Sequence, residues 1–330
     1  MPQLRQNIIT GDWVVIAPER AKRPSDFITS GMVRRDHKDN CAFCVGSDAW
    51  QTRLRGVKDE LDHIYVIPNR YPAFVASPDK CERRSFPEEM FYASKPAVGG
   101  HEVIIIKDHD LLVTEFPQIV MLQMLQMLQR RYQWYAQADC RPEYTMGIYN
   151  YGHEAGASIW HPHAQIFASA IIPNLIMKEK QGAERYFESN GVCVFCDLLA
   201  HEKKMKIRLQ VESRHFTSFT FYAARFPFEI MILPTTHQSR FEDASLSELA
   251  NVAVVLRETL ARIQRVLNNP PLNIFIHSLP NTSSESDYYH WHIEIAPRLT
   301  TYGGFELGGS TIIDVVSPEK AASYLRDGKE

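Results

Sequence analysis

The feature that most constrains the fold of this 330-residue chain is a pattern of cysteines and histidines that occurs twice. The first copy has a C-x-x-C pair, a histidine that follows an apolar run, and an H-x-H pair: Cys41, Cys44, His109, His161 and His163. The second copy has the same order: Cys193, Cys196, His237, His290 and His292. The interval from the single histidine to the H-x-H pair is nearly equal, 52 residues in the first copy and 53 in the second. Repetition of a whole pattern indicates two copies of one supersecondary unit. We therefore expect two domains, residues 1–180 and residues 181–330.

Each copy combines short apolar runs with one long amphipathic segment. Apolar residues at helical spacing predict one helix over residues 117–137 and a second over 245–266, which starts with the capping-box pair Ser245 and Glu248. The apolar runs predict strands at 102–106, 144–149, 165–172, 229–233, 272–277 and 292–296. Strands grouped around one helix in each half favour an α+β fold over a doubly wound parallel sheet. The charged segment 173–191 is the expected boundary between the halves.

Two thiols and two imidazoles in each copy are the ligand set of a closed, tetrahedral zinc site. We expect one structural zinc ion at Cys41, Cys44, His109 and His161, and a second at Cys193, Cys196, His237 and His290. One alternative is that either pair consists of unused thiols. Thiol–disulfide exchange is a second alternative, but the C-x-x-C pairs lack the βαβ setting of a thioredoxin-like motif.

The segment His161-Pro-His163-Ala-Gln165 carries the expected chemistry. Because strand side chains alternate, His161, His163 and Gln165 are expected to share one face. With His161 bound to metal, His163 is held rigidly and its imidazole can attack phosphorus, while Gln165 donates to a phosphate oxygen. The alternative is a pair of strand histidines without chemistry. In the second copy Glu294 replaces the glutamine, and its charge would repel phosphate, so that unit is expected to be structural and to complete the substrate site.

The overall composition narrows the class of protein. A net charge of −3 argues against broad, sequence-independent nucleic-acid binding, which needs a basic surface. The N-terminus lacks an apolar core of signal-peptide length, and no apolar run reaches the about 18 residues that span a bilayer. We expect a cytoplasmic protein with no membrane and no nucleic-acid partner.

Several motifs, in order along nearly the whole chain, resemble the galactose-1-phosphate uridylyltransferase family of the histidine-triad superfamily. The His161-Pro-His163-Ala-Gln165 segment is the most specific of them. The others are the opening segment 11–24, Cys41-Ala-Phe-Cys44, the segment 68–72, Asn150-Tyr-Gly152, the segment 155–158, Phe226-Pro-Phe-Glu229 and Gly303-Gly-Phe-Glu306. The resemblance implies two tandem histidine-triad-like units, each an antiparallel sheet with a long helix, and a homodimer.

The same resemblance implies a double displacement. His163 attacks the α-phosphorus of a nucleotide sugar and releases the sugar 1-phosphate, and a second phosphate then takes the nucleotide from the histidine. Gln165 would assist at the phosphate. The substrate-binding residues implied are Arg20, Arg23, Asn69, Asn150, Ser158 and Glu306, with Asn69 near the nucleoside and Glu306 at the sugar hydroxyls.

The chain departs from the family pattern in ways that leave the substrates open. Ala164 stands where classical uridylyltransferases have glycine, and the tail after Glu306 lacks their glutamine. The second C-x-x-C is typical of a two-zinc branch that includes ADP-glucose phosphorylases. The leading hypothesis is UDP-glucose:hexose-1-phosphate uridylyltransferase. The alternatives are an ADP-glucose phosphorylase that uses inorganic phosphate, and a zinc-stabilised nucleotide-binding protein without catalysis.

Overall fold

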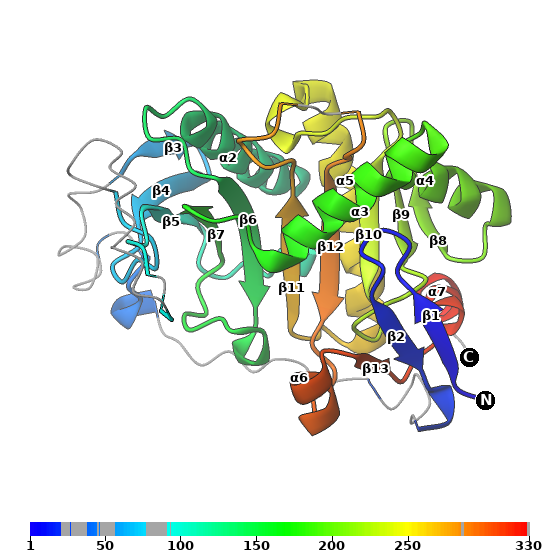
Figure 1. Ribbon diagram of the computed structural model, residues 1–330. Coiled ribbons are helices and arrows are strands. Elements are labelled where there is room, and N and C mark those ends of the chain that lie inside the picture. The colour runs from blue at the N-terminus through cyan, green and yellow to red at the C-terminus, as the bar shows by residue number, and fades with distance from the viewer. Residues whose placement is uncertain are drawn as a thin grey trace.

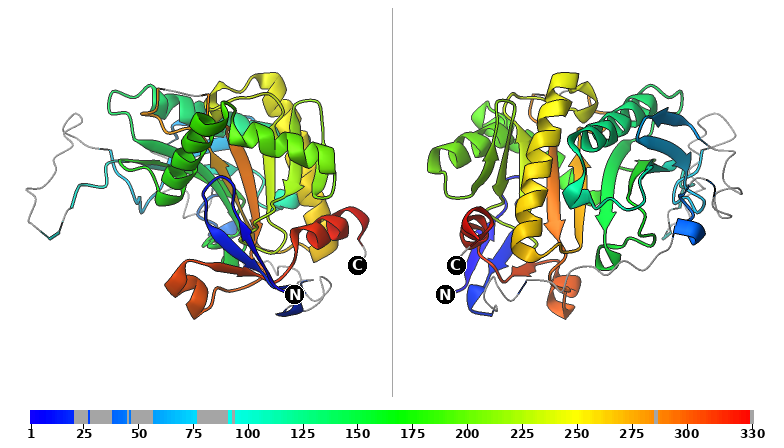
Figure 2. Two further views of the ribbon diagram at one scale, coloured as in Figure 1. Left: turned by 45° about the vertical axis from the view of Figure 1, so that its right-hand side comes forward. Right: turned by 180° about the vertical axis from the view of Figure 1, so that it is seen from behind.

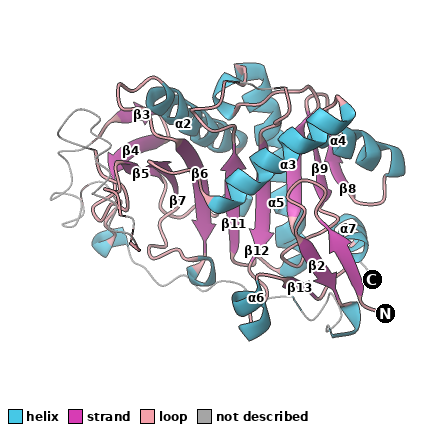
Figure 3. Cartoon of the chain, in the orientation of Figure 1, coloured by secondary structure: helices cyan, strands magenta, loops and turns pink. Residues whose placement is uncertain are grey.

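The fold is α+β, as expected, with helices on both faces of one large antiparallel sheet (Figures 1 and 3). The structure is a computed structural model that describes residues 1–20, 27, 38–44, 46, 57–76, 91–92, 94–284 and 287–328. Within these residues, no helix combines the length and apolar composition needed to cross a bilayer.

The large sheet has ten strands in the described part of the chain. The first half contributes β3 (Asp59–Leu61), β4 (Ile64–Pro68), β5 (Gly99–Ile106), β6 (Tyr144–Tyr151) and β7 (His163–Ser169). The second half contributes β8 (Leu209–Glu212), β9 (Phe216–Thr220), β10 (Ile230–Pro234), β11 (Leu272–His277) and β12 (His292–Pro297). From the outer edge inward, the order is β3-β4-β5-β7-β6 in one half and β8-β9-β10-β12-β11 in the other. The identical order is the structural form of the sequence repeat.

The two half-sheets are joined at their inner edges by β6 and β11. These strands pair antiparallel, with Tyr149 opposite Ile274. An inner edge strand left alone would expose a row of unpaired backbone N–H and C=O groups. Pairing β6 with β11 removes both edges, so the two units share one continuous sheet. The sequence pattern did not predict this union.

The two long helices are equivalent connections. α2 (Gln118–Ala136) joins β5 to β6, and α5 (Leu246–Leu267) joins β10 to β11. Figure 2 shows both on the same face of the sheet, seen from behind in its right-hand view. The capping box at the start of α5 forms as predicted, because Ser245 accepts from the Glu248 N–H and the Glu248 carboxylate accepts from the Ser245 N–H.

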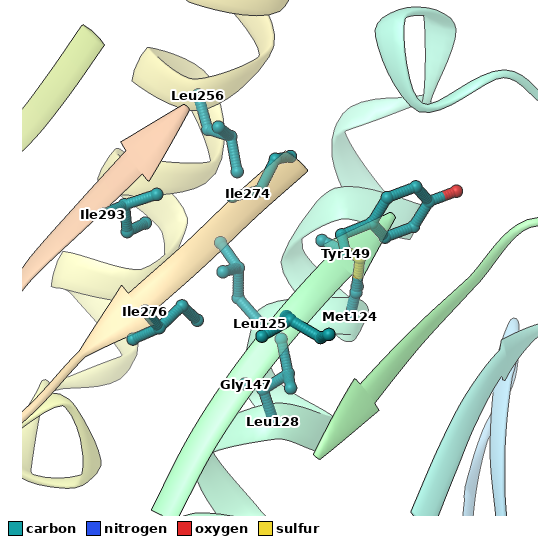
Figure 4. A pocket seen from close by; sticks show the side chains of 10 residues that line it. Met124, Leu125, Leu128, Gly147, Tyr149, Leu256, Ile274, Ile276 and Ile293 are labelled. Atoms are coloured by element: carbon teal, nitrogen blue, oxygen red, sulfur yellow. The ribbon is translucent and has the colours of Figure 1, made fainter. Parts of the chain in front are cut away.

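The core between these helices and the sheet is tightly packed, apart from a small cavity. The small cavity in Figure 4 lies where α2 and α5 meet β6 and β11, has a volume of about 10 Å³, and is lined mainly by Leu, Ile and Met side chains. A cavity needs about 10–15 Å³ and polar partners to hold even one water molecule. It is therefore a packing gap in the core and too small for a substrate.

The opposite face of the sheet is covered unevenly. α3 (Asn174–Asn190) crosses β11 and β12, and α4 (Val194–Met205) follows it over the second half (Figure 1). The expected boundary segment is thus itself the helix α3. Among the described residues, no helix covers the same face of β4, β5 and β7. The segment 41–44 packs there instead, with Phe43 against Val103 and Ile105 of β5. This face also carries the polar side chains described below.

The N- and C-terminal segments form a separate layer. β1 (Gln3–Gln6), β2 (Trp13–Ile16) and β13 (Ile312–Asp314) make a three-stranded sheet, flanked by the short α6 (Gly304–Gly309) and by α7 (Pro318–Asp327). This layer lies beside the second half of the large sheet (Figure 1).

Candidate active site

Four predicted metal ligands of the first half converge on one point. Cys41 and Cys44 follow the short η3 helix (Lys38–Asn40), His109 follows β5, and His161 precedes β7. The Sγ atom of Cys41 lies 3.4 Å from Nδ1 of His161, and the Sγ atom of Cys44 lies 3.1 Å from Nδ1 of His109. All four ligand atoms lie within 4.8 Å of one another. The spacing suits a single metal ion bound by all four.

A backbone hydrogen bond fixes the tautomer of His161 in the first site. Nε2 of His161 lies 2.6 Å from the carbonyl oxygen of Ile106, so Nε2 carries the proton and Nδ1 presents a lone pair. Nδ1 of His109 lies only 3.0 Å from Nδ1 of His161. The same nitrogen of His109 also faces the Cys44 thiol, so with its proton on Nε2 His109 would present a lone pair to the same point as His161. The donor set therefore fits a bound metal ion.

The second predicted ligand set also converges. Cys193, Cys196, His237 and His290 have their ligand atoms within 4.8 Å of one another. The Sγ atom of Cys196 lies 3.4 Å from Nδ1 of His237 and 3.6 Å from Nδ1 of His290. A hydrogen bond from the Cys193 thiol lowers the pKa of Cys196 well below its usual value, which makes the thiolate ligand available.

His163 is the first residue of β7 and is held by its neighbours. Its Nδ1 lies 2.7 Å from the carbonyl oxygen of His161, and the ring of Phe43 packs edge-on at 5.1 Å. A carbonyl oxygen only accepts, so Nδ1–H donates and Nε2 keeps its lone pair. Burial lowers the pKa of His163, which favours this neutral form. The ring thus presents a lone pair on Nε2, and its orientation is fixed by the backbone of His161, a predicted metal ligand.

Gln165 shares a strand face with His163, as predicted, while His161 lies before the strand and turns toward the cysteines. The Gln165 Oε1 atom lies 2.8 Å from Nε2 of His101 on β5. The amide nitrogen of Asn69 is 3.1 Å from the same ring nitrogen. His101 therefore brings two predicted site residues, Asn69 and Gln165, to one point.

Asn150 lies beside His163, because Tyr149 pairs with Ala164 in the β6–β7 register. Asn273 of β11 donates to Oδ1 of Asn150 at 2.8 Å, and its own Oδ1 accepts from Arg298 at 3.3 Å. This chain of bonds leaves the amide nitrogen of Asn150 as the end available to a ligand. A strand of the second half thereby orients a side chain of the first.

The remaining predicted substrate residues are spread over the molecule. Ser158 is exposed in the loop between β6 and β7. Arg20 ends the short η1 helix (Pro18–Arg20), which follows β2, and Figure 1 shows β2 and β7 on opposite sides of the molecule. Glu306 lies in α6 and accepts from the N–H of Gly303 at 3.0 Å. Arg23 lies outside the described residues. The chain alone therefore does not join Arg20 or Glu306 to His163.

In the second half, His292 is the counterpart of His163, but it is buried by its neighbours. His292 donates from Nδ1 to the carbonyl oxygen of His290 at 3.1 Å, in the same way as His163. Its ring is fully buried and packs against His277, and Nε2 lies 3.8 Å from a carboxylate oxygen of Glu294. Glu179 of α3 lies 3.2 Å from His277. The helix that covers this half thus closes access to His292.

Glu179, His277, His292 and Glu294 form a third buried acidic and histidine group that could hold a cation. Arg225 already contacts Glu294 at 2.5 Å and Glu229 at 2.6 Å. Burial alone would raise the pKa of Glu294, but Arg225 and the two histidines lower it to about 2. We therefore interpret the group as an ion-pair network. Glu179, His277, Arg225 and His101 were not predicted, because no short motif contains them.

Comparison with known proteins gives consistent matches over the whole chain. The family model of the galactose-1-phosphate uridyl transferase N-terminal domain matches residues 1–173, and that of the C-terminal domain matches residues 179–327. ADP-glucose phosphorylase of Arabidopsis thaliana is 32% identical over 99% of this chain and 93% of its own length. Galactose-1-phosphate uridylyltransferase of Thermotoga maritima is 27% identical over 99% and 98%.

Solved structures are similar as well. The crystal structure of an ADP-glucose phosphorylase from Arabidopsis thaliana with bound ADP-glucose has a TM-score of 0.83 and 30% identity, and covers 100% of both chains. A uridylyltransferase structure has a TM-score of 0.75 and 25% identity, over 99% of this chain and 98% of that one.

Proposed function

This chain belongs to the galactose-1-phosphate uridylyltransferase family, and we propose that it transfers a nucleotidyl group through a covalent intermediate on His163. Membership makes it a hexose-1-phosphate nucleotidyltransferase, so the hypothesis of a binding protein without catalysis is set aside. The observation that carries the proposal is the 2.7 Å hydrogen bond from His163 Nδ1 to the His161 carbonyl. It leaves Nε2 with a lone pair on the face of β7 that also carries Gln165.

The two steps follow from this geometry. In the first, Nε2 of His163 attacks the α-phosphorus, a P–N bond forms, and the P–O bond to the sugar phosphate breaks. The sugar 1-phosphate leaves with the electron pair. In the second, a phosphate oxygen of the acceptor attacks the same phosphorus and the P–N bond breaks. The Nδ1 proton stays on the ring throughout, and the His161 carbonyl stabilises the positive charge that develops there.

Two amides are the proposed donors to the non-bridging oxygens. Gln165 and Asn150 lie on the same face as His163, and their oxygen ends already accept hydrogen bonds from His101 and Asn273. Their NH₂ ends are therefore available where negative charge increases in the transition state. Ser158 is the third proposed phosphate contact, and Asn69 is the proposed nucleoside contact.

We propose zinc as the metal at both Cys₂His₂ groups, with a structural role. Two thiolates and two imidazoles complete a tetrahedral shell and leave no open position for a substrate. In the first group the ion would hold His161, whose carbonyl orients His163. The proposed division at residue 180 follows the same logic, with the nucleophile in the first unit and a non-catalytic second unit.

Arg20, Arg23 and Glu306 are proposed to bind phosphate and sugar, as expected from the family resemblance. Glu306 lies in α6, away from the β7 face, so a second copy of the chain is the proposed source of this carboxylate. The proposed assembly is accordingly a homodimer. Dissociation of such a dimer would lower activity without loss of the nucleophile, which enzyme dilution with light scattering would detect.

UDP-glucose with galactose 1-phosphate is the proposed substrate pair, and ADP-glucose with inorganic phosphate is the second candidate. The second candidate is favoured by the 32% identity to ADP-glucose phosphorylase and by the similarity to its ADP-glucose complex. A direct test offers each pair to the full-length protein. Formation of UDP-galactose and glucose 1-phosphate as products supports the first pair. Formation of ADP and glucose 1-phosphate as products supports the second. Absence of both product sets, with wild-type indistinguishable from His163→Asn, would overturn the proposal.

A further inference from the structure

A side-chain amide such as that of Gln165 has a donor end and an acceptor end, and only the donor end stabilises a phosphate oxygen. The two orientations differ by a half-turn about the last side-chain torsion, which is soft in glutamine. An unrestrained Gln165 would present the wrong end part of the time. A neighbouring group that fixes the torsion would therefore raise the rate without itself contacting the substrate.

The protonation of His101 determines which end of Gln165 it holds. Nδ1 of His101 lies 3.2 Å from the backbone N–H of Ala73, which can only donate, so Nδ1 accepts and carries no proton. In the neutral imidazole the proton is then on Nε2. That nitrogen lies 2.8 Å from Oε1 of Gln165 and donates to it. The Gln165 NH₂ group consequently faces away from His101.

The surroundings of His101 hold the ring in this state. Only 9% of the residue is exposed, and the ring stacks on Phe167 at a centroid distance of 4.0 Å. Burial lowers the pKa of His101, so the neutral form dominates near neutral pH. Nδ2 of Asn69 also lies 3.1 Å from Nε2, but Asn69 Oδ1 accepts from the Tyr71 N–H, so Asn69 offers only a donor. Gln165 Oε1 is thus the acceptor of the His101 proton.

We propose that His101 is a positioning residue that locks Gln165 with its NH₂ group toward the phosphate attacked by His163. This inference rests on the proposed nucleotidyl transfer and deepens it by adding a residue on β5. In the opposite tautomer, the Nδ1–H and the Ala73 N–H would be two donors facing each other. Nε2 would then be an acceptor, and the Gln165 amide would turn its NH₂ group toward His101. The position of one proton therefore decides which end of Gln165 reaches the substrate.

Two substitutions at position 101 separate positioning from packing. In His101→Gln the amide nitrogen can occupy the place of Nε2 and still donate to Gln165. In His101→Asn the shorter side chain reaches only the place of Nδ1, so it keeps the Ala73 contact and loses Gln165. We expect His101→Asn to lower kcat about 10–100-fold with a smaller change in KM, as for loss of an outer orienting partner. His101→Gln should retain most of the activity.

A double-mutant cycle with Gln165→Met shows whether His101 acts through Gln165. Loss of one transition-state donor costs about 10²–10³ in kcat, so Gln165→Met alone should fall in that range. Adding His101→Asn to it should cause no more than about a threefold further loss, since coupled residues are non-additive. The inference would be overturned if His101→Asn lowered kcat as much in the Gln165→Met background as it does alone. Equal losses of kcat in His101→Asn and His101→Gln would also overturn it.

Two measurements on the wild-type protein keep this inference distinct from the proposed function. Nitrogen-15 shifts of histidine-labelled protein report the His101 tautomer without any substrate, and a proton on Nδ1 would overturn the inference even if a variant fails to fold. Transfer of an α-labelled nucleotide to the protein reports the function. A wild-type chain that takes no label contradicts the proposed function and this role together. A chain that takes label while the variants behave alike contradicts only the role of His101.

Discussion

Replacement of the two equivalent histidines, one in each half, tests the asymmetry of the molecule. In His163→Asn and His292→Asn the new amide can still donate to the preceding histidine carbonyl in place of Nδ1. Both variants therefore keep the backbone contact, recorded at 2.7 Å for His163 and 3.1 Å for His292, and both lose Nε2. Each variant is the matched control for the other.

The expected magnitudes differ because the two Nε2 atoms have different surroundings. Nε2 of His163 is the proposed attacking atom, and losing it should lower kcat by more than about 10⁴-fold, or about 5 kcal/mol of transition-state stabilisation. His292 is fully buried beside Glu294 and His277. Its replacement should destabilise the fold by about 1–3 kcal/mol, because the smaller side chain leaves a gap at a fully buried position, and it should leave most of the activity.

Steady-state kinetics and urea denaturation of the two variants give the readouts. The reasoning predicts a catalytic defect with nearly native stability in His163→Asn and the reverse in His292→Asn. Equal losses of kcat in two equally stable proteins would mean that the second half also performs chemistry. The interpretation of α3 as a cover over His292 would then be wrong.

Three further predictions concern metal, stability and kinetics. The purified protein should contain about two zinc equivalents per chain, and Cys41→Ser and Cys193→Ser should each lose one with a fall in melting temperature; elemental analysis without zinc would contradict both sites. Arg131→Ala should cost about 2–4 kcal/mol in urea unfolding, because it removes the hydrogen bonds of 2.7 and 2.9 Å to the buried Glu102 carboxylate and leaves it with Lys58, at 2.8 Å, as its remaining cation. The exposed neighbour Arg130 is the control, and Arg130→Ala should cost at most about 1 kcal/mol; similar losses would refute the burial argument. Initial rates should give parallel double-reciprocal lines, with exchange of labelled sugar 1-phosphate into nucleotide sugar without acceptor; intersecting lines and no exchange would indicate direct transfer.

The local parts of the fold and site could be predicted from the sequence. The cysteine and histidine ligands could be predicted from their repeated pattern in the sequence, and the structure brings both predicted sets together. The long helices α2 and α5 follow from apolar periodicity, and the cap at Ser245 follows from its partner Glu248. In each case the interacting residues are close in the chain or belong to a recognisable repeat.

Features that depend on strand register could not be predicted. His101 reaches Gln165 only because β5 pairs with β7, and Asn273 reaches Asn150 only because β11 pairs with β6. The single continuous sheet depends on that same β6–β11 contact. The segment that forms α3 was expected only as a boundary, because it is rich in charged residues. Nothing in the sequence distinguishes Glu179, which contacts His277, from the other charged residues of this segment. Long-range pairing of this kind leaves no periodic signal in one sequence.

The most direct test of the central claim is isolation of the covalent intermediate. The protein is incubated with α-labelled UDP-glucose or ADP-glucose without acceptor, denatured, digested and mapped by mass spectrometry. The account predicts close to one label per active chain on the peptide that contains His163, stable in alkali and lost in acid, as for a phosphorus–nitrogen bond. Added acceptor should discharge it from the native protein. Full transferase activity with no protein-bound label, or label on another residue, would contradict the claim that His163 is the nucleophile.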